Sequence, residues 1–73
     1  MKVTELKKTR MQLASRLYQV RTKLGITQMQ LQKEGIISQS HLSKIENGEI
    51  NVSAIMLYHL ATYYGKDLNF FFE

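Results

Sequence analysis

Five polar residues near the middle of the chain carry side chains that can hydrogen-bond to the edges of nucleic-acid bases: Gln39, Ser40, Ser43, Lys44 and Asn47. On a helix that turns about 100° per residue, they share one arc of roughly 140°. The arc holds amide, hydroxyl and amine groups and no carboxylate. Amides pair with adenine, amines with guanine, and hydroxyls with several bases. This arc favours a helix that touches DNA, and the alternative interpretation is a solvated face without a ligand.

The same segment has an apolar side that would hold the polar arc in place. Leu42 and Ile45 lie opposite the polar residues, which indicates one buried face and one exposed face. Ser38 is a typical N-cap and Gly48 a typical residue for ending a helix. The sequence therefore predicts a short helix that is capped by Ser38 and runs through Asn47.

Helical spacing recurs along the rest of the chain. Leu13, Leu17, Val20 and Leu24 predict one face of a first helix that ends at Gly25. Thr27 is the expected cap of a second short helix over residues 28–34. After the polar segment, a fourth helix is predicted over residues 53–64 and a last helical turn over residues 68–72. No segment alternates with a period of two. We therefore predict an all-α fold, a compact bundle of four to five short helices.

The predicted core combines one apolar stripe from each helix. Its members are Leu13, Leu17, Val20, Leu24, Leu31, Ile37, Leu42, Ile45, Leu57, Leu60, Ala61, Leu68 and Phe71. On the fourth helix, Leu57, Tyr58, Ala61 and Tyr64 are expected on the buried side, and Ile55, Met56, His59 and Tyr63 on the side that faces water.

Composition narrows the class of protein. The chain has 73 residues and a net charge of +4, and its first 23 residues hold seven Lys or Arg against one acid. Such a basic segment suits an anionic partner, either nucleic acid or a membrane surface. The chain contains no Cys, no long apolar run and no apolar region behind its basic start, so we expect a soluble cytoplasmic domain without disulfides.

Catalytic and metal chemistry are not expected. His41 and His59 are far apart in sequence and have no carboxylate or thiol at ligand spacing. Ser40 and His41 are adjacent, so their side chains diverge on a helix and cannot form a catalytic pair. The chain has no glycine-rich phosphate loop. We therefore expect no enzyme activity, no cofactor and no metal.

The stretch TQMQLQKEGIISQSHLSKIENG, residues 27–48, resembles the helix-turn-helix of the Xre/Cro family of phage repressors and bacterial regulators. The resemblance spans about residues 12–72 and rests on Thr27-Gln28, Leu31, Ile37-Ser38 and the run from Leu42 to Gly48. It implies a lambda repressor-like fold in a single domain over residues 1–73, in which residues 1–11 form a basic N-terminal extension. That extension is expected to be either a basic arm along DNA or extra turns of the first helix.

The resemblance implies a sequence-specific transcriptional regulator that binds double-stranded DNA, with repression as the favoured mode and the helix at about 38–47 in the major groove. The implied base contacts are Gln39, Ser40, Ser43 and Lys44. The candidate phosphate contacts are Arg10, Arg16, Arg21, Lys23, Gln28 and Asn47, although Asn47 could instead only ease the chain out of the helix. Arg21 and Glu46 are implied to form a structural ion pair.

The chain departs from the family pattern in the turn between the two helices. Gln32 stands where the family usually has Ala, and Ile36 stands where it usually has Gly. Small residues there let the helices pack closely. We therefore expect Gln32 to point outward at one edge, or the helices to cross at a slightly wider angle.

Proteins of this fold read pseudo-palindromic sites as two-fold dimers. The surplus apolar residues of the C-terminal part predict a homodimer interface that contains Ile55, Met56, Phe70 and Phe72. Two other functions stay open: a protein-interaction module of the same fold without DNA binding, and the DNA-binding head of a longer regulator, for example a peptide-sensing one. No membrane partner is expected, and the location is the cytoplasm at the nucleoid.

Overall fold

The computed structural model describes residues 2–73, and within them it contains four α-helices and a C-terminal 3-10 helix. The elements are α1 (Val3–Lys23), α2 (Gln28–Lys33), α3 (Gln39–Glu46), α4 (Ala54–Tyr64) and η1 (Leu68–Phe72). No strand occurs among the described residues, and the all-α prediction is confirmed. Residue 1 of the predicted N-terminal extension lies outside the described part.

Side-chain caps fix where the three later α-helices begin. The hydroxyl oxygens of Thr27, Ser38 and Ser53 each accept a hydrogen bond from the backbone N–H three residues ahead, at 3.0 to 3.2 Å. Such a bond satisfies one of the N–H groups that a helix leaves without an intrahelical acceptor. The starts of α2 and α3 are as predicted, whereas each of these two helices ends one residue earlier than predicted.

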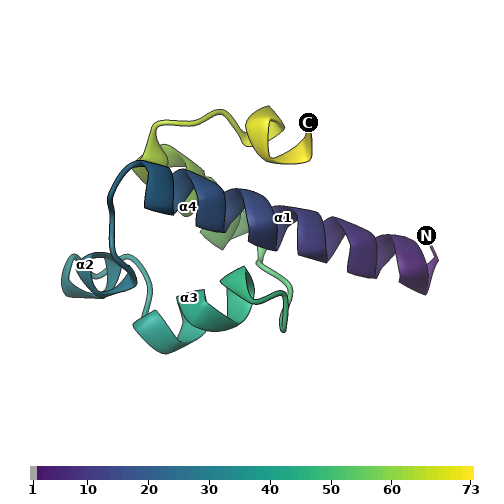
Figure 1. Cartoon of the computed structure of the whole chain (residues 1–73), viewed down its shortest axis with the longest axis horizontal. Coiled ribbons are helices and arrows are strands. Elements are labelled where there is room, and N and C mark those ends of the chain that lie inside the picture. Colours follow the sequence, from purple (N-terminus) through teal and green to yellow (C-terminus); the bar gives the residue numbers. More distant parts are fainter. Residues whose placement is uncertain (1) are drawn as a thin grey trace.

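Helix α1 is the long axis of the molecule, and the other elements pack around it (Figure 1). In this view α3 lies along one side of α1 and η1 lies along the other, and both pack on α1. The first turns of α1 extend beyond the body at the N-terminal end (Figure 1). The described residues of the N-terminal extension therefore form extra turns of α1, and a contact of this basic segment with DNA stays a prediction.

The core gathers apolar side chains from every helix. Leu17, Leu31, Leu42, Leu60 and Phe71 are fully buried, one from each of the five elements. Most of the predicted core is confirmed, and Ala14 and Tyr64 belong to it as well. Leu13 is only half-buried and packs against this core.

The prediction that Leu24 and Leu68 are buried is wrong, and both residues lie at the end of a helix. Leu24 is 50% exposed because it is the C-cap of α1, where the chain leaves the packed layer. Leu68 is 39% exposed because it is the first residue of η1, and Phe71 fills the core from that element. Tyr58 is also 57% exposed, contrary to its expected place on the buried side of α4, since Leu60 occupies that side.

Candidate nucleic-acid interface

The polar arc predicted from the sequence lies on the exposed side of α3. Gln39, Ser40 and Lys44 are exposed, and Ser43 is half-buried. The apolar residues of the same helix are buried against α1 and α2. Helix α3 is thus held by one face, and its other face presents amide, hydroxyl and amine groups to the surroundings. Asn47 caps the helix behind them and contacts the Ser43 hydroxyl at 3.5 Å.

A single buried carboxylate joins the three helices that hold this face. Glu46 of α3 accepts two hydrogen bonds from the guanidinium of Arg21 in α1, at 2.7 and 2.8 Å. The amide of Gln28 in α2 donates to the same carboxylate at 3.0 Å. The bond to Glu46 raises the pKa of Arg21 further above its ordinary value. The pair implied by the resemblance is therefore present, and it ties α1 and α2 to the C-terminal turn of α3.

Arg21 directs its guanidinium into the protein. Besides its two bonds to Glu46, it donates to the carbonyl oxygen of Ile26 at 2.8 Å. The residue is 8% exposed. A phosphate contact by Arg21 does not fit this geometry, because all three of its guanidinium nitrogens have partners inside the protein. The role that fits is to position α3.

Tyr64 is a core residue near the Arg21–Glu46 ion pair. Its hydroxyl is buried and has no hydrogen-bond partner within the described residues. Burial, followed by the negative charge of Glu46, raises the pKa of Tyr64 well above its usual range. The phenol is therefore neutral at any ordinary pH, and it adds no charge next to the ion pair.

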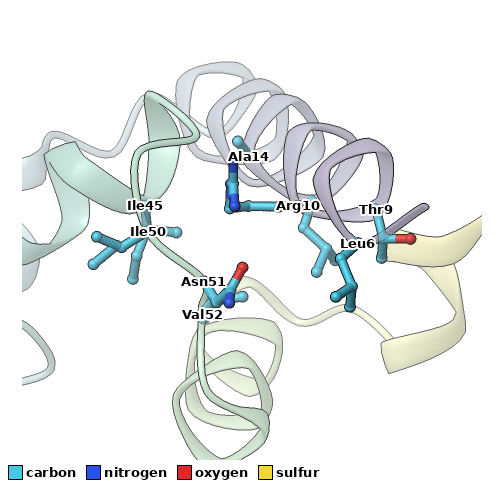
Figure 2. Close-up of a pocket in the computed structure, with 9 residues that line it drawn as sticks. Leu6, Thr9, Arg10, Ala14, Ile45, Ile50, Asn51 and Val52 are labelled. Carbon is cyan, nitrogen blue, oxygen red and sulfur yellow. The ribbon is translucent and has the colours of Figure 1, made fainter. Parts of the chain in front are cut away.

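Arg10 reaches from α1 to the end of α3. Its Nε donates to the carbonyl oxygen of Gly48 at 2.9 Å, and it crosses a hollow that is also lined by Leu6, Ile50 and Val52 (Figure 2). Gly48 is buried with a φ of +74°, a conformation that glycine adopts without strain. The Nε of Arg10 anchors the loop that follows α3, and the predicted phosphate contact stays a prediction for its two terminal nitrogens.

Arg16 and Lys23 are the other basic candidates on α1. Arg16 donates to the backbone oxygen of Glu73, and its guanidinium lies 5.7 Å from the centre of the Phe70 ring. Both partners belong to the η1 side, opposite α3 in Figure 1. Arg16 is thus separated from the polar face of α3. Lys23 is exposed at the last turn of α1 and lines the same groove as Arg16 and Phe70, so it too lies on the η1 side.

The four predicted dimer residues divide into two pairs. Ile55 and Phe72 are 74% and 52% exposed, as an interface would require. Met56 and Phe70 are half-buried and pack against the core, so they offer less surface to a partner. This difference arises because α4 uses Met56 to cover the core and η1 packs Phe70 between Arg16 and Lys66.

Besides the Gln28–Glu46 bond, sequence reasoning missed two polar links between helices. The Tyr63 hydroxyl donates to Glu34 at 2.5 Å and accepts from Gln30 at 3.1 Å, which ties α2 to α4. The bond to Glu34 raises the pKa of Tyr63. The second link joins Gln32 of α2 to the backbone N–H of Gln39 in α3 at 2.7 Å. Gln32 is exposed, as expected, and its departure from the family pattern was the only sequence signal for this contact.

Other kinds of site have no support in the described residues. Residues 2–73 contain no group of three or more His, Asp or Glu placed to hold a metal ion. No helix in that range has the length and apolar character needed to cross a bilayer.

Comparison with known families gives one match. A family model described as helix-turn-helix matches residues 17–71, which is more than half of the chain. The matched range includes α2, α3 and α4 in full and only the last two turns of α1. No curated protein and no solved structure gives a significant match.

Proposed function

We propose that this chain, which belongs to the Xre/Cro-type helix-turn-helix family, regulates transcription by binding specific sequences in double-stranded DNA, with repression as its mode. The family assignment supports DNA binding by a regulator. Repression is the simplest mode, because a protein bound at a promoter blocks the site without contacting any other protein.

The observation that carries this proposal is the exposed face of α3. It presents Gln39, Ser40, Ser43 and Lys44 without a carboxylate that would repel phosphate. The opposite face is buried, and Glu46 ties the helix to α1 and α2. A rigid helix with such a face can enter the major groove, which is wide enough to admit an α-helix.

In this mechanism α3 reads bases and its surroundings bind the DNA backbone. Gln39 pairs with adenine and Lys44 with guanine, while the two serines let the backbone of the helix approach the groove floor. Asn47, the terminal nitrogens of Arg10 and the N–H of the Gln28 amide that is not bonded to Glu46 remain as proposed phosphate contacts. These contacts set the register of the protein on DNA but carry no sequence information.

The experiment that tests the function is a binding-site selection on random duplex DNA, followed by the Lys44→Ala variant. We expect the native chain to enrich a defined sequence. Lys44→Ala should lose about 1–3 kcal/mol of discrimination at one base pair, because a bidentate contact to guanine is removed. Equal weakening on every duplex would show that Lys44 contacts only phosphate, and no enrichment by the native chain would contradict sequence-specific binding.

We also propose a homodimer that uses the exposed residues Ile55 and Phe72. Phe72→Ser should shift the monomer–dimer equilibrium toward monomer in sedimentation experiments and weaken binding to two half-sites about 10–10.5 base pairs apart. The matched control is Leu24→Ser, which removes an apolar residue of similar exposure from the far end of α1. A native chain that stays monomeric at high concentration and on DNA would contradict the dimer.

A further inference from the structure

Gln32 connects the two helices of the helix-turn-helix through one directional bond. It lies in the last turn of α2, and its Oε1 accepts from the backbone N–H of Gln39 at 2.7 Å. Gln39 is the first residue of α3, and its side chain belongs to the exposed polar face. A side chain of α2 is therefore bonded to the peptide group of the residue expected to read a base.

This bond adds to the usual means of holding the start of a helix. The first N–H groups of α3 have no intrahelical acceptor. The Ser38 hydroxyl accepts from the N–H of His41 at 3.2 Å, and Gln32 accepts from that of Gln39. Alanine, which is usual at position 32 in the family, has no acceptor. The link is thus a feature of this chain and not of the general pattern.

The apolar contacts between α2 and α3 constrain the geometry less tightly. Leu31, Ile37 and Leu42 belong to the same buried core, and the hydrophobic attraction between them has no preferred direction. A short hydrogen bond has a preferred length and direction. It therefore restricts the N-terminal turn of α3, where a shift of the backbone moves the Gln39 side chain directly.

We propose that Gln32 is a positioning residue for base recognition. By holding the N–H of Gln39, it fixes the start of α3 and places the Gln39 amide for a two-bond contact to adenine. This inference rests on the proposed function, because it concerns the same face of α3. Gln32 acts through Gln39 and does not itself touch the base.

Two substitutions separate positioning from direct contact. Gln32→Ala removes the acceptor and releases the first turn of α3. Gln32→Glu keeps an acceptor for the Gln39 N–H but has no N–H donors and adds a negative charge near DNA. If Gln32 positions Gln39, Gln32→Glu should bind all duplexes more weakly and keep the native base preference. If Gln32 contacts a base itself, Gln32→Glu should change that preference, which would overturn the proposal.

The measurement uses the 73-residue chain and the sequence that the native chain selects from random duplex DNA. The Gln39→Ala variant first identifies the base pair that Gln39 reads, as the position where discrimination disappears. The ratio of the affinity for the selected sequence to the affinity for a duplex changed at that base pair should be about 5- to 150-fold for the native chain. Gln32→Ala should reduce this ratio at least about threefold, the lower end of what one net hydrogen bond is worth. Its affinity for unrelated DNA should be unchanged, and its melting temperature should be no lower than that of Gln30→Ala.

Gln30→Ala is the matched control. Gln30 lies on the same short helix, but its amide faces Glu34 and Tyr63 and not α3. This variant should keep the native ratio. If Gln32→Ala also keeps the native ratio, or lowers the melting temperature and the affinity for all duplexes in parallel, Gln32 has no role in positioning and the proposal fails.

Amide hydrogen exchange distinguishes failure of the bond from failure of the function. The Gln39 N–H should exchange slowly in the native chain and in Gln32→Glu, and at least several-fold faster in Gln32→Ala, whether or not DNA is bound. If the native chain selects no DNA sequence, the proposed function is refuted, and the positioning role with it. Slow exchange of the Gln39 N–H in that same chain would show that the Gln32–Gln39 bond still forms. Equal exchange in all three proteins would refute the bond itself.

Discussion

Replacing Glu46 by alanine is expected to lower the free energy of unfolding by about 3–5 kcal/mol, the usual cost of removing one partner of a buried ion pair. Arg21 would keep its charge at 8% exposure but lose two hydrogen bonds, and the Gln28 amide would lose its acceptor. A domain of 73 residues has a total stability of only roughly 4–11 kcal/mol. Urea unfolding followed by circular dichroism should therefore show a much lower midpoint than that of the native chain.

Three further variants make this result specific. Glu49→Ala removes an exposed acid three residues later and should change stability by less than about 0.5 kcal/mol. Glu46→Gln keeps one acceptor oxygen, so its stability should lie between those of Glu46→Ala and Glu49→Ala. The double variant Arg21→Met with Glu46→Leu should recover most of the loss, because it removes both buried charges. A Glu46→Ala protein as stable as the Glu49→Ala protein would show that the pair does not hold these helices together.

Helix boundaries could be predicted because they depend on local chemistry. Thr27, Ser38 and Ser53 cap the backbone within their own turns, so the sequence contains both donor and acceptor of each bond. Gly25 and Gly48 follow α1 and α3 in the left-handed conformation that helix ends favour. The Arg21–Glu46 pair was accessible only through the resemblance, since its two residues are 25 positions apart.

The partners of long side chains could not be predicted in the same way. Arg10 and Arg16 looked like phosphate contacts because they are basic, yet their partners in the fold lie 38 and 57 residues away. Which carbonyl oxygen comes within reach depends on how the end of α3 and η1 pack on α1. A charge pattern indicates that a side chain needs a partner, but it does not indicate whether that partner is DNA or the protein backbone.

The same limit applies to Gln32 and Tyr58. The sequence indicated that Gln32 points outward, and it does, but its bond to Gln39 depends on the distance between α2 and the start of α3. Tyr58 was expected on the buried side of α4 from its angle alone. It is exposed because Leu60 and Tyr64 already fill the space that α4 covers. Periodicity places residues on a face, whereas the neighbouring elements decide which part of that face is covered.

The second large effect is expected in the salt dependence of DNA binding. A dimer that brings Arg10 and Lys44 of each subunit to the DNA should lose about 10² in affinity between 50 and 200 mM salt, because cations bound at the DNA surface release counterions. The slope counts only cationic contacts, so Gln28 and Asn47 contribute nothing to it even if they bind phosphate. Among the basic candidates, Arg21 is fully paired within the protein and Arg16 is directed toward η1.

The slope therefore tests where the DNA lies on the molecule. Lys44→Gln should reduce its magnitude by up to about 0.9 for each subunit, since a cation held in the groove displaces counterions even while its amine bonds to guanine. Arg16→Gln removes the same charge from the opposite side of α1 and should leave the slope unchanged. Fluorescence anisotropy titrations of a labelled duplex at five salt concentrations give the slope directly. A nearly flat response from the native chain would favour a protein partner over DNA, and equal changes in both variants would mean that DNA does not lie preferentially against α3.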